Sequence, residues 1–170
     1  MDQQPNPHRK TGVLMLAIAW LLVFAGIFWF FDGWYQRQYN PNPHSVLQSQ
    51  QGEVVLQRNR AGHYVADGEI NGNTVTFLLD TGATQVALSS HLAMRLGLKR
   101  EMGVSVQTAN GTVQGFATRL AVVRLGPIEL HNVSAVVTDG IEDDTVLLGM
   151  SFLKQLEFTQ RNDQLILKPL

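Results

Sequence analysis

One short segment of the sequence carries residues suited to proton-transfer chemistry. Residues 77–84 read FLLDTGAT, so Asp80 follows three apolar residues and precedes Thr81 and Gly82. The apolar run is typical of a buried strand, which would deliver the carboxylate of Asp80 to the floor of a cleft, where it could give or accept a proton. The alternative is a plain turn at the end of a strand, with Asp80 as a solvated cap.

Few other residues compete for a chemical role. The chain has 170 residues, a formal net charge of −1 and no cysteine, which excludes disulfides, a cysteine nucleophile and thiolate metal sites. The five histidines lack the paired spacing of metal sites, and Ser151 lies in GMSFL, which lacks the second glycine of a serine-hydrolase elbow. The acidic run 142–144 is typical of a solvated loop. We expect no metal, no cofactor and no nucleic-acid partner.

The elements around Asp80 are short β-rich runs separated by turn signals. Asn71-Gly72 and Asn110-Gly111 indicate hairpins, because the favoured two-residue turn needs positive φ at both positions. Strands are expected at 53–57, 63–70, 73–79, 104–108, 112–125 and 128–137. Two short helices are expected, at 91–96 between the caps Ser89-Ser90 and Gly97, and at 150–156. The fold class is therefore mostly β.

A second segment has the same layout as the first. Val146-Leu147-Leu148-Gly149 follows a hairpin and precedes a helix, as the Asp80 segment does, and its glycine lies 67 residues after Gly82. Apolar residues before glycine are common, so this faint repeat gains weight only beside the Asp-Thr-Gly motif.

Together, the two segments resemble the retropepsin-like aspartic proteases, the family that includes the retroviral proteases. The family's pattern is apolar-apolar-Asp-Thr-Gly-Ala-Thr, then apolar-apolar-Gly before a C-terminal helix, and the resemblance covers residues 63–158. It implies a closed β-barrel, the acid-protease half-domain, with short helices. It also implies an aspartic endopeptidase that needs no cofactor. With its apolar N-terminal run, the chain looks like a bacterial membrane-anchored group of this family.

The resemblance assigns roles to individual positions. Asp80 would be the catalytic aspartate, and its loop would be supported by Thr81, Gly82, Ala83, Thr84, Leu148 and Gly149. Among these, Thr81 would brace the two active-site loops across a dimer, and Gly82 would present backbone groups to the substrate. The hairpin at Asn110 and Gly111 would be the flap over a bound peptide, with Phe116 as its one aromatic candidate.

Peptide hydrolysis of this type needs two carboxylates that share one proton: one activates a water, and the other, protonated, polarises the carbonyl. The chain has one Asp-Thr-Gly, and no other acid is followed by Thr-Gly or Ser-Gly. We therefore expect a homodimer that cleaves polypeptides, with the two Asp80 residues meeting on its axis. Residues 164–167 could add a strand to a dimer sheet or close the monomer's own sheet.

Residues 13–31 are nineteen positions without a charge. A helix of that length covers about 28 Å, close to the ~30 Å hydrocarbon core of a bilayer. The run is longer than a signal-peptide core, and it ends in aromatic residues rather than in a small-residue cleavage site. We expect a retained transmembrane helix, in preference to a cleaved signal or a buried core helix.

Charge and composition then predict the layout of the chain. Two basic residues precede the span and one follows within fifteen residues, which places residues 1–12 in the cytoplasm. Residues 32–51, rich in Gln, Asn and Pro, are expected to be a flexible tether, and 52–170 the protease domain. We expect a single-pass inner-membrane protein with a periplasmic protease domain.

A second interpretation comes from a different class: a membrane-tethered peptide-binding or scaffold module that keeps the fold without catalysis. Strand addition at a sheet edge binds peptides without any chemistry. The intact Asp-Thr-Gly argues against this interpretation, because a scaffold has no need of a carboxylate that faces its like across a dimer axis.

Overall fold

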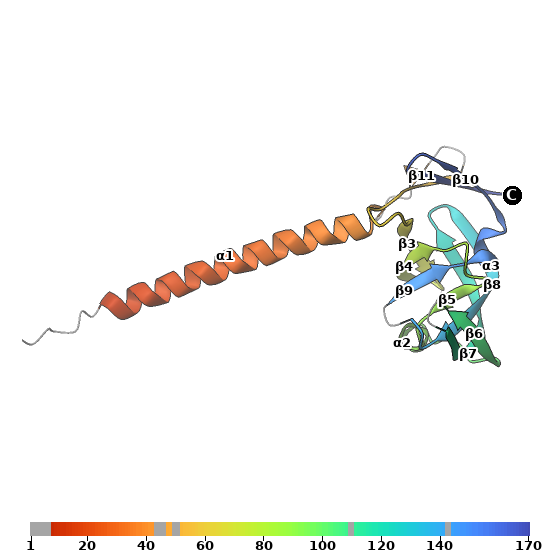
Figure 1. The fold of residues 1–170 in the computed structure, drawn as a ribbon, viewed down its shortest axis with the longest axis horizontal. Coiled ribbons are helices and arrows are strands. Elements are labelled where there is room, and N and C mark those ends of the chain that lie inside the picture. Colours follow the sequence, from red (N-terminus) through yellow and green to blue (C-terminus); the bar gives the residue numbers. More distant parts are fainter. Residues whose placement is uncertain (1–7, 43–46, 49–51, 109–110, 142–143) are drawn as a thin grey trace, which may run out of the picture. The chain divides into compact units, whose positions relative to one another are not determined.

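The computed structural model describes residues 8–42, 47–48, 52–108, 111–141 and 144–170. The chain divides into two units, Met1–Gln38 and Tyr39–Leu170. The first is built on helix α1 (His8–Tyr39), and the second holds the described strands and the two short helices (Figure 1).

Helix α1 is long and apolar. Within the described part of the chain, one helical stretch, Thr11–Tyr35, is long and apolar enough to cross a membrane. Its 25 residues correspond to about 38 Å of helix. The helix contains all of the expected span 13–31 and continues to Tyr39, about two turns further than expected.

Seven strands of the second unit form one sheet, in the order β3-β4-β9-β5-β8-β7-β6. They are β3 (Val65–Ile70), β4 (Asn73–Leu79), β5 (Val86–Leu88), β6 (Gly103–Thr108), β7 (Gly111–Leu125), β8 (Ile128–Thr138) and β9 (Thr145–Leu148). The last part of β7 also pairs with β3, at Glu69 with Arg124 and Ile70 with Val123. This pairing closes six strands into a barrel and leaves β6 as an outer hairpin strand, so the predicted fold class is confirmed.

The predicted turn and cap signals explain the local structure. Asn71 and Gly72 both have positive φ, 51° and 81°, as the turn between β3 and β4 requires. Helix α2 (Ser90–Arg95) begins where Ser89 accepts a hydrogen bond from the Leu92 amide. Helix α3 (Met150–Leu153) is shorter than the expected 150–156, because a turn at residues 154–155 leads into a strand that begins at Leu156.

A second sheet has the order β1-β2-β11-β10. Its strands are β1 (Leu47–Gln48), β2 (Val54–Gln57), β10 (Leu156–Arg161) and β11 (Gln164–Pro169). Strand β11 pairs with β10 on one side and with β2 on the other. Of the two arrangements considered for residues 164–167, the structure therefore shows the strand in the monomer's own sheet.

The segment after α1 differs from the expected tether. Asn40 and Asn42 are 8% and 3% exposed. The Asn42 amide donates to the carbonyls of Gln57 and Val65, at 2.9 and 2.8 Å, and its oxygen accepts from the Gln57 amide at 2.9 Å. Asn40 donates to the Asp67 carboxylate at 2.9 Å.

The folded unit therefore begins at Tyr39, not near Gly52, and the tether prediction is wrong for residues 32–42. An asparagine-rich composition is typical of a solvated linker. Here, however, the Asn42 amide pairs with backbone groups at the end of β2 and the start of β3, and the Asn40 amide pairs with the Asp67 carboxylate and the Asn42 amide N–H, because each side chain offers both a donor and an acceptor. The remainder of the predicted tether, at 43–46 and 49–51, lies outside the described residues.

A single apolar core supports the barrel. Its largest fully buried side chains include Phe77, Leu88, Leu92, Leu120, Leu125, Leu148 and Phe152. Burial of one such side chain stabilises the fold by about 1.5–3 kcal/mol. Phe77 and Leu148 lie on the two strands that carry the repeated motif, so the core fixes the strands that deliver it.

Candidate active site

The two strands of the repeat lie side by side. Strands β4 and β9 are parallel and pair residue by residue, with Phe77 opposite Val146 and Leu79 opposite Leu148. The chain leaves both strands at the same end, where the Asp80 amide donates to the Leu148 carbonyl at 3.3 Å. The faint sequence repeat is therefore a structural pair that brings the Asp80 segment and Gly149 together.

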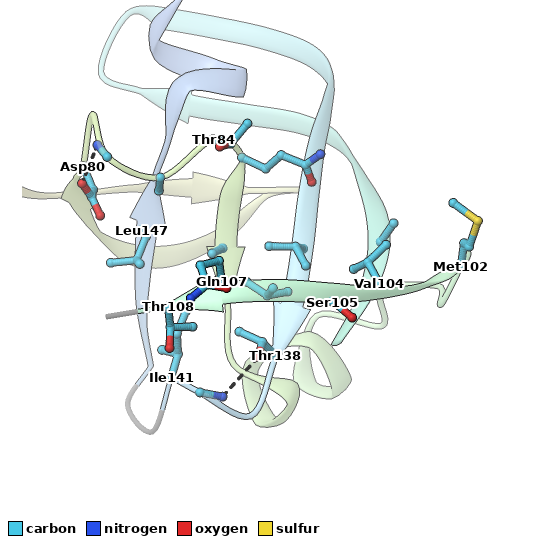
Figure 2. A pocket seen from close by; sticks show the side chains of 18 residues that line it. Asp80, Thr84, Met102, Val104, Ser105, Gln107, Thr108, Thr138, Ile141 and Leu147 are labelled. Carbon is cyan, nitrogen blue, oxygen red and sulfur yellow. Dashed lines mark hydrogen bonds between the residues drawn. The ribbon is translucent and has the colours of Figure 1, made fainter. Parts of the chain in front are cut away.

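The side chain and the backbone of Asp80 stabilise the turn that follows this residue. The Gly82 amide donates to Oδ1 of Asp80 at 2.8 Å, and the Ala83 amide donates to the Asp80 carbonyl at 3.3 Å. A side-chain oxygen that accepts from the amide two residues later is typical of Asp at the start of a turn. The carboxylate is half-buried and lies at one side of a cleft (Figure 2). The structure thus contains the turn that the alternative interpretation predicts after this strand. Asp80 in this turn also lines the cleft.

Backbone amides at the start of helix α3 bind the Asp80 loop. The Met150 amide donates to the Ala83 carbonyl at 2.8 Å, and the Ser151 amide to the Thr84 carbonyl at 3.0 Å. The first amides of a helix have no partner within it, so here they bind the Asp80 loop. A β-carbon on Gly149 would stand 2.3 Å from the Gln85 carbonyl oxygen and 2.6 Å from that of Ala83. Glycine therefore permits this close approach.

The predicted site residues divide into an exposed and a buried group. Thr81, Gly82 and Thr84 are exposed in the single chain, and Ala83 is half-buried. Leu148 and Gly149 are buried beneath them. The structure thus brings all six to the Asp80 loop or directly under it.

A cleft of about 620 Å³ lies beside the loop. Its described lining consists of Asp80, Gly82, Ala83, Thr84, Gln85, Ala87, Met102, Val104, Ser105, Val106, Gln107, Thr108, Ala117, Val136, Thr138, Gly140, Ile141 and Leu147. Among these described residues, Asp80 alone has an ionisable side chain. Figure 2 shows β6 running along the cleft, with Ser105, Gln107 and Thr108 on it.

The expected flap coincides with the hairpin of β6 and β7. Asn110 lies outside the described residues. Gly111 begins β7 with φ 116°, and its carbonyl accepts from the Thr108 hydroxyl at 2.8 Å. Phe116 is not at the tip of this hairpin. It pairs with Gly103 at the base, and the Arg100 guanidinium lies 4.6 Å from its ring centre.

An ion pair joins α2 to the start of β9. Arg95 and His91 contact the Asp144 carboxylate at 2.7 and 3.3 Å. The hydrogen bond from Arg95, followed by that from His91, lowers the pKa of Asp144 from its ordinary value of 3.8. The prediction of a solvated acidic loop missed these partners of Asp144, because they lie about 50 positions away in the sequence. Glu142 and Asp143 lie outside the described residues.

Comparison with known proteins identifies the class. Residues 66–155 match the family described as "gag-polyprotein putative aspartyl protease". The matched region contains the Asp80 loop, the hairpin of β6 and β7, and α3. The chain belongs to this family of retropepsin-like aspartyl proteases.

Two curated bacterial proteins are similar to this chain in sequence. A Sinorhizobium protein encoded in the region 5′ of cobV is 37% identical over 134 residues, which cover 75% of this chain and 58% of that protein. An uncharacterised protein of Rickettsia prowazekii is 33% identical over 120 residues, covering 68% and 51%. The chain thus spans little more than half the length of these relatives.

A solved structure shares the fold. The crystal structure of a retropepsin-like aspartic protease from Rickettsia conorii is 34% identical to this chain, with a TM-score of 0.57. The match covers 68% of this chain and 89% of that one.

Proposed function

We propose that this chain is an aspartic endopeptidase in which Asp80 is the catalytic residue. The observation that carries the proposal is the position of the Asp80 carboxylate. It lies at the end of the paired strands β4 and β9, beside the cleft, on a loop fixed by the Gly82 and Met150 amides. Membership of a family of aspartic proteases supports the same chemistry.

The second carboxylate of the dyad comes from a second copy of the chain. Retropepsin-like proteases function as homodimers that act on peptides, and this sequence has one Asp-Thr-Gly. The exposed side of the loop, at Thr81, Gly82 and Thr84, is the surface that the two copies share. One Asp80 then takes a proton from the attacking water, while the other, protonated, donates to the carbonyl oxygen of the substrate.

The cleft suits an extended polypeptide. Backbone groups of Gly82 and the strand β6 offer hydrogen bonds of the kind that hold a peptide strand. The described lining is uncharged apart from Asp80, so the side chains flanking the cleaved bond are uncharged, since burial of an unpaired charge is costly.

Helix α1 is proposed to anchor the protease as a single-pass protein of the inner membrane. The charge bias around the span places the N-terminus in the cytoplasm and the protease domain in the periplasm. Two domains in one membrane meet at a high effective concentration, so a weak dimer interface is sufficient. A reporter enzyme fused after Leu170 and active only in the periplasm tests this sidedness: activity supports it, and inactivity of an expressed fusion contradicts it.

The catalytic proposal is tested with the full chain purified in detergent and a mixed peptide library at pH 4–7. The wild type, Asp80→Asn and a control, Asp163→Asn, are compared. Asp163 forms an exposed ion pair with Arg58, which contributes little to stability. We expect cleavage by the wild type and the control, and none by Asp80→Asn. Peptide binding without cleavage by all three proteins would instead support the scaffold function.

A further inference from the structure

A serine hydroxyl lies between β5 and β8 where the two strands begin to pair. The strands are parallel, with Val86 opposite Ala135. The Val86 amide donates to the Ser151 hydroxyl at 2.9 Å, and that hydroxyl donates to the Ser134 carbonyl at 2.7 Å. Ser151, from α3, thus links β5 to β8 through its hydroxyl at the first residue pair of these two strands.

The same serine is bonded to the Asp80 loop through its backbone. Its amide donates to the Thr84 carbonyl at 3.0 Å, and the preceding amide, of Met150, donates to the Ala83 carbonyl at 2.8 Å. Three of the four positions from Ala83 to Val86 are therefore bonded to the first two residues of α3. This segment joins the Asp80 turn to the barrel strand β5, so whatever fixes it also fixes the direction of the Asp80 carboxylate.

The bridge needs a short side chain that both accepts and donates. A serine hydroxyl does both. Alanine at the same position leaves the Val86 amide and the Ser134 carbonyl without this partner. Val86 is fully buried, so its amide has poor access to replacement water, and a buried unpaired donor is unfavourable. The expected response is a shift of the segment 83–86 toward other partners.

We propose that Ser151 is a positioning residue for Asp80, acting through its hydroxyl bridge between Val86 and Ser134. The proposal rests on the proposed protease function of Asp80. Ser151 is not among the described residues that line the cleft, so it acts on the Asp80 loop and not on the substrate.

The test compares the wild type with Ser151→Ala, Ser151→Thr and Ser151→Cys, all as full chains in detergent. Ser90→Ala is the matched control, since Ser90 begins the other short helix, α2. Displacement of a catalytic group by about 1 Å costs on the order of 100-fold in rate. For Ser151→Ala we expect kcat to fall by about 10- to 100-fold, with KM changed by less than about threefold.

The two conservative variants separate the hydroxyl from the volume of the side chain. Threonine keeps a hydroxyl, so Ser151→Thr should recover most of kcat. Cysteine keeps the size but is a weak donor and acceptor, so Ser151→Cys should lose kcat without a change in KM. If Ser151→Ala does not fold, Ser151→Cys carries the test. Full kcat in Ser151→Cys or in folded Ser151→Ala overturns the proposal, as does a loss in Ser151→Thr equal to that in Ser151→Ala.

Amide hydrogen exchange gives a readout that does not need activity. Residues 83–86 should exchange faster in Ser151→Ala than in the wild type, while strands β2 and β11, which pair with each other in the second sheet, keep their protection. Unchanged exchange at 83–86, or an equal increase throughout the domain, overturns the proposal. If the wild type cleaves no peptide, the proposed function fails, but the exchange data still decide whether Ser151 fixes the loop.

Discussion

The α-carbon of Gly149 faces the carbonyl oxygen of Gln85 so closely that a β-carbon on the glycine would stand 2.3 Å from that oxygen. The two residues belong to the two halves of the repeat, and their backbones touch where α3 meets the Asp80 loop. Because the obstructing atoms are backbone atoms, no rotamer change can relieve the contact. The fit of the loop against α3 therefore depends on glycine at this position.

Substitution of Gly149 by alanine should damage both stability and catalysis. Overpacking of a tight site costs about 1–3 kcal/mol, and here the relief must come from movement of the Asp80 loop. We expect a loss of that size in the free energy of unfolding, measured with urea, and at least a tenfold loss of cleavage. Gly103→Ala is the control for stability, since nothing lies within 4 Å of a β-carbon there. Equal stability of the two variants would contradict the assigned role of Gly149.

Asn42 should stabilise the domain, although it lies in the expected linker. Its side chain makes three hydrogen bonds to the backbones of Gln57 and Val65 and is 3% exposed. Unpaired buried groups cost about 1–3 kcal/mol each, so Asn42→Ala should lower the free energy of unfolding by about 3 kcal/mol. Asn73→Ala is the control, because its amide makes only long contacts, of 3.3 and 3.5 Å. A change in Asn42→Ala no larger than that in Asn73→Ala would show that the segment is not part of the folded unit.

The ion pair between Asp144 and Arg95 should make stability depend on pH in the acid range. Arg95 and then His91 lower the pKa of Asp144 from 3.8, so the ionised carboxylate is favoured in the folded state. Its contribution is complete above pH 3.8 and is lost as the pH falls through the lower pKa of the folded state.

The measurement for Asp144 is the free energy of unfolding between about pH 2 and 6, for the wild type and Asp144→Asn. The wild type should lose more stability than the variant below about pH 4, while the difference between the two should be constant above it. Parallel curves over the whole range would mean that the pair with Arg95 does not form in solution.

Cleavage should be greatest at acidic to near-neutral pH. The dyad needs one carboxyl that keeps its proton while the other is ionised, and alkaline solution removes that proton. A pH–rate profile of the full chain with one cleaved peptide measures this. Full activity at pH 9 would be incompatible with an aspartic dyad.

Local signals in the sequence predicted the elements that carry the site. Strand β4 has the predicted bounds Asn73–Leu79, because Asn71-Gly72 fixes its start and Asp80 follows its apolar end. The capped helix after Ser89 was predicted for the same kind of reason: a cap is a contact between residues three apart. The Asp-Thr-Gly motif and each half of the faint repeat indicate the site because each is a short contiguous segment of the sequence.

The sequence did not reveal features that depend on distant partners. Asn40 and Asn42 have the composition of a linker. Their hydrogen-bond partners Gln57, Val65 and Asp67 are distant in the sequence and come close only in the fold. The end of α3 was misplaced because Leu156 fits a helix or a strand, and its pairing in β10 with Pro169 decides for the strand. For Ser151, the sequence shows only that it does not lie in a serine-hydrolase elbow, since nothing local shows that its hydroxyl bridges Val86 and Ser134.

The central claim, that one active site contains Asp80 from two chains, is tested most directly by mixing. The full-length wild type at a fixed concentration is combined with a growing excess of Asp80→Asn, and subunits are allowed to exchange before peptide cleavage is measured. Mixed dimers have one carboxyl instead of two, so activity should fall steadily toward zero as the excess grows, while excess Asp163→Asn should not lower it. Activity that stays constant under a large excess of folded Asp80→Asn would contradict the shared site.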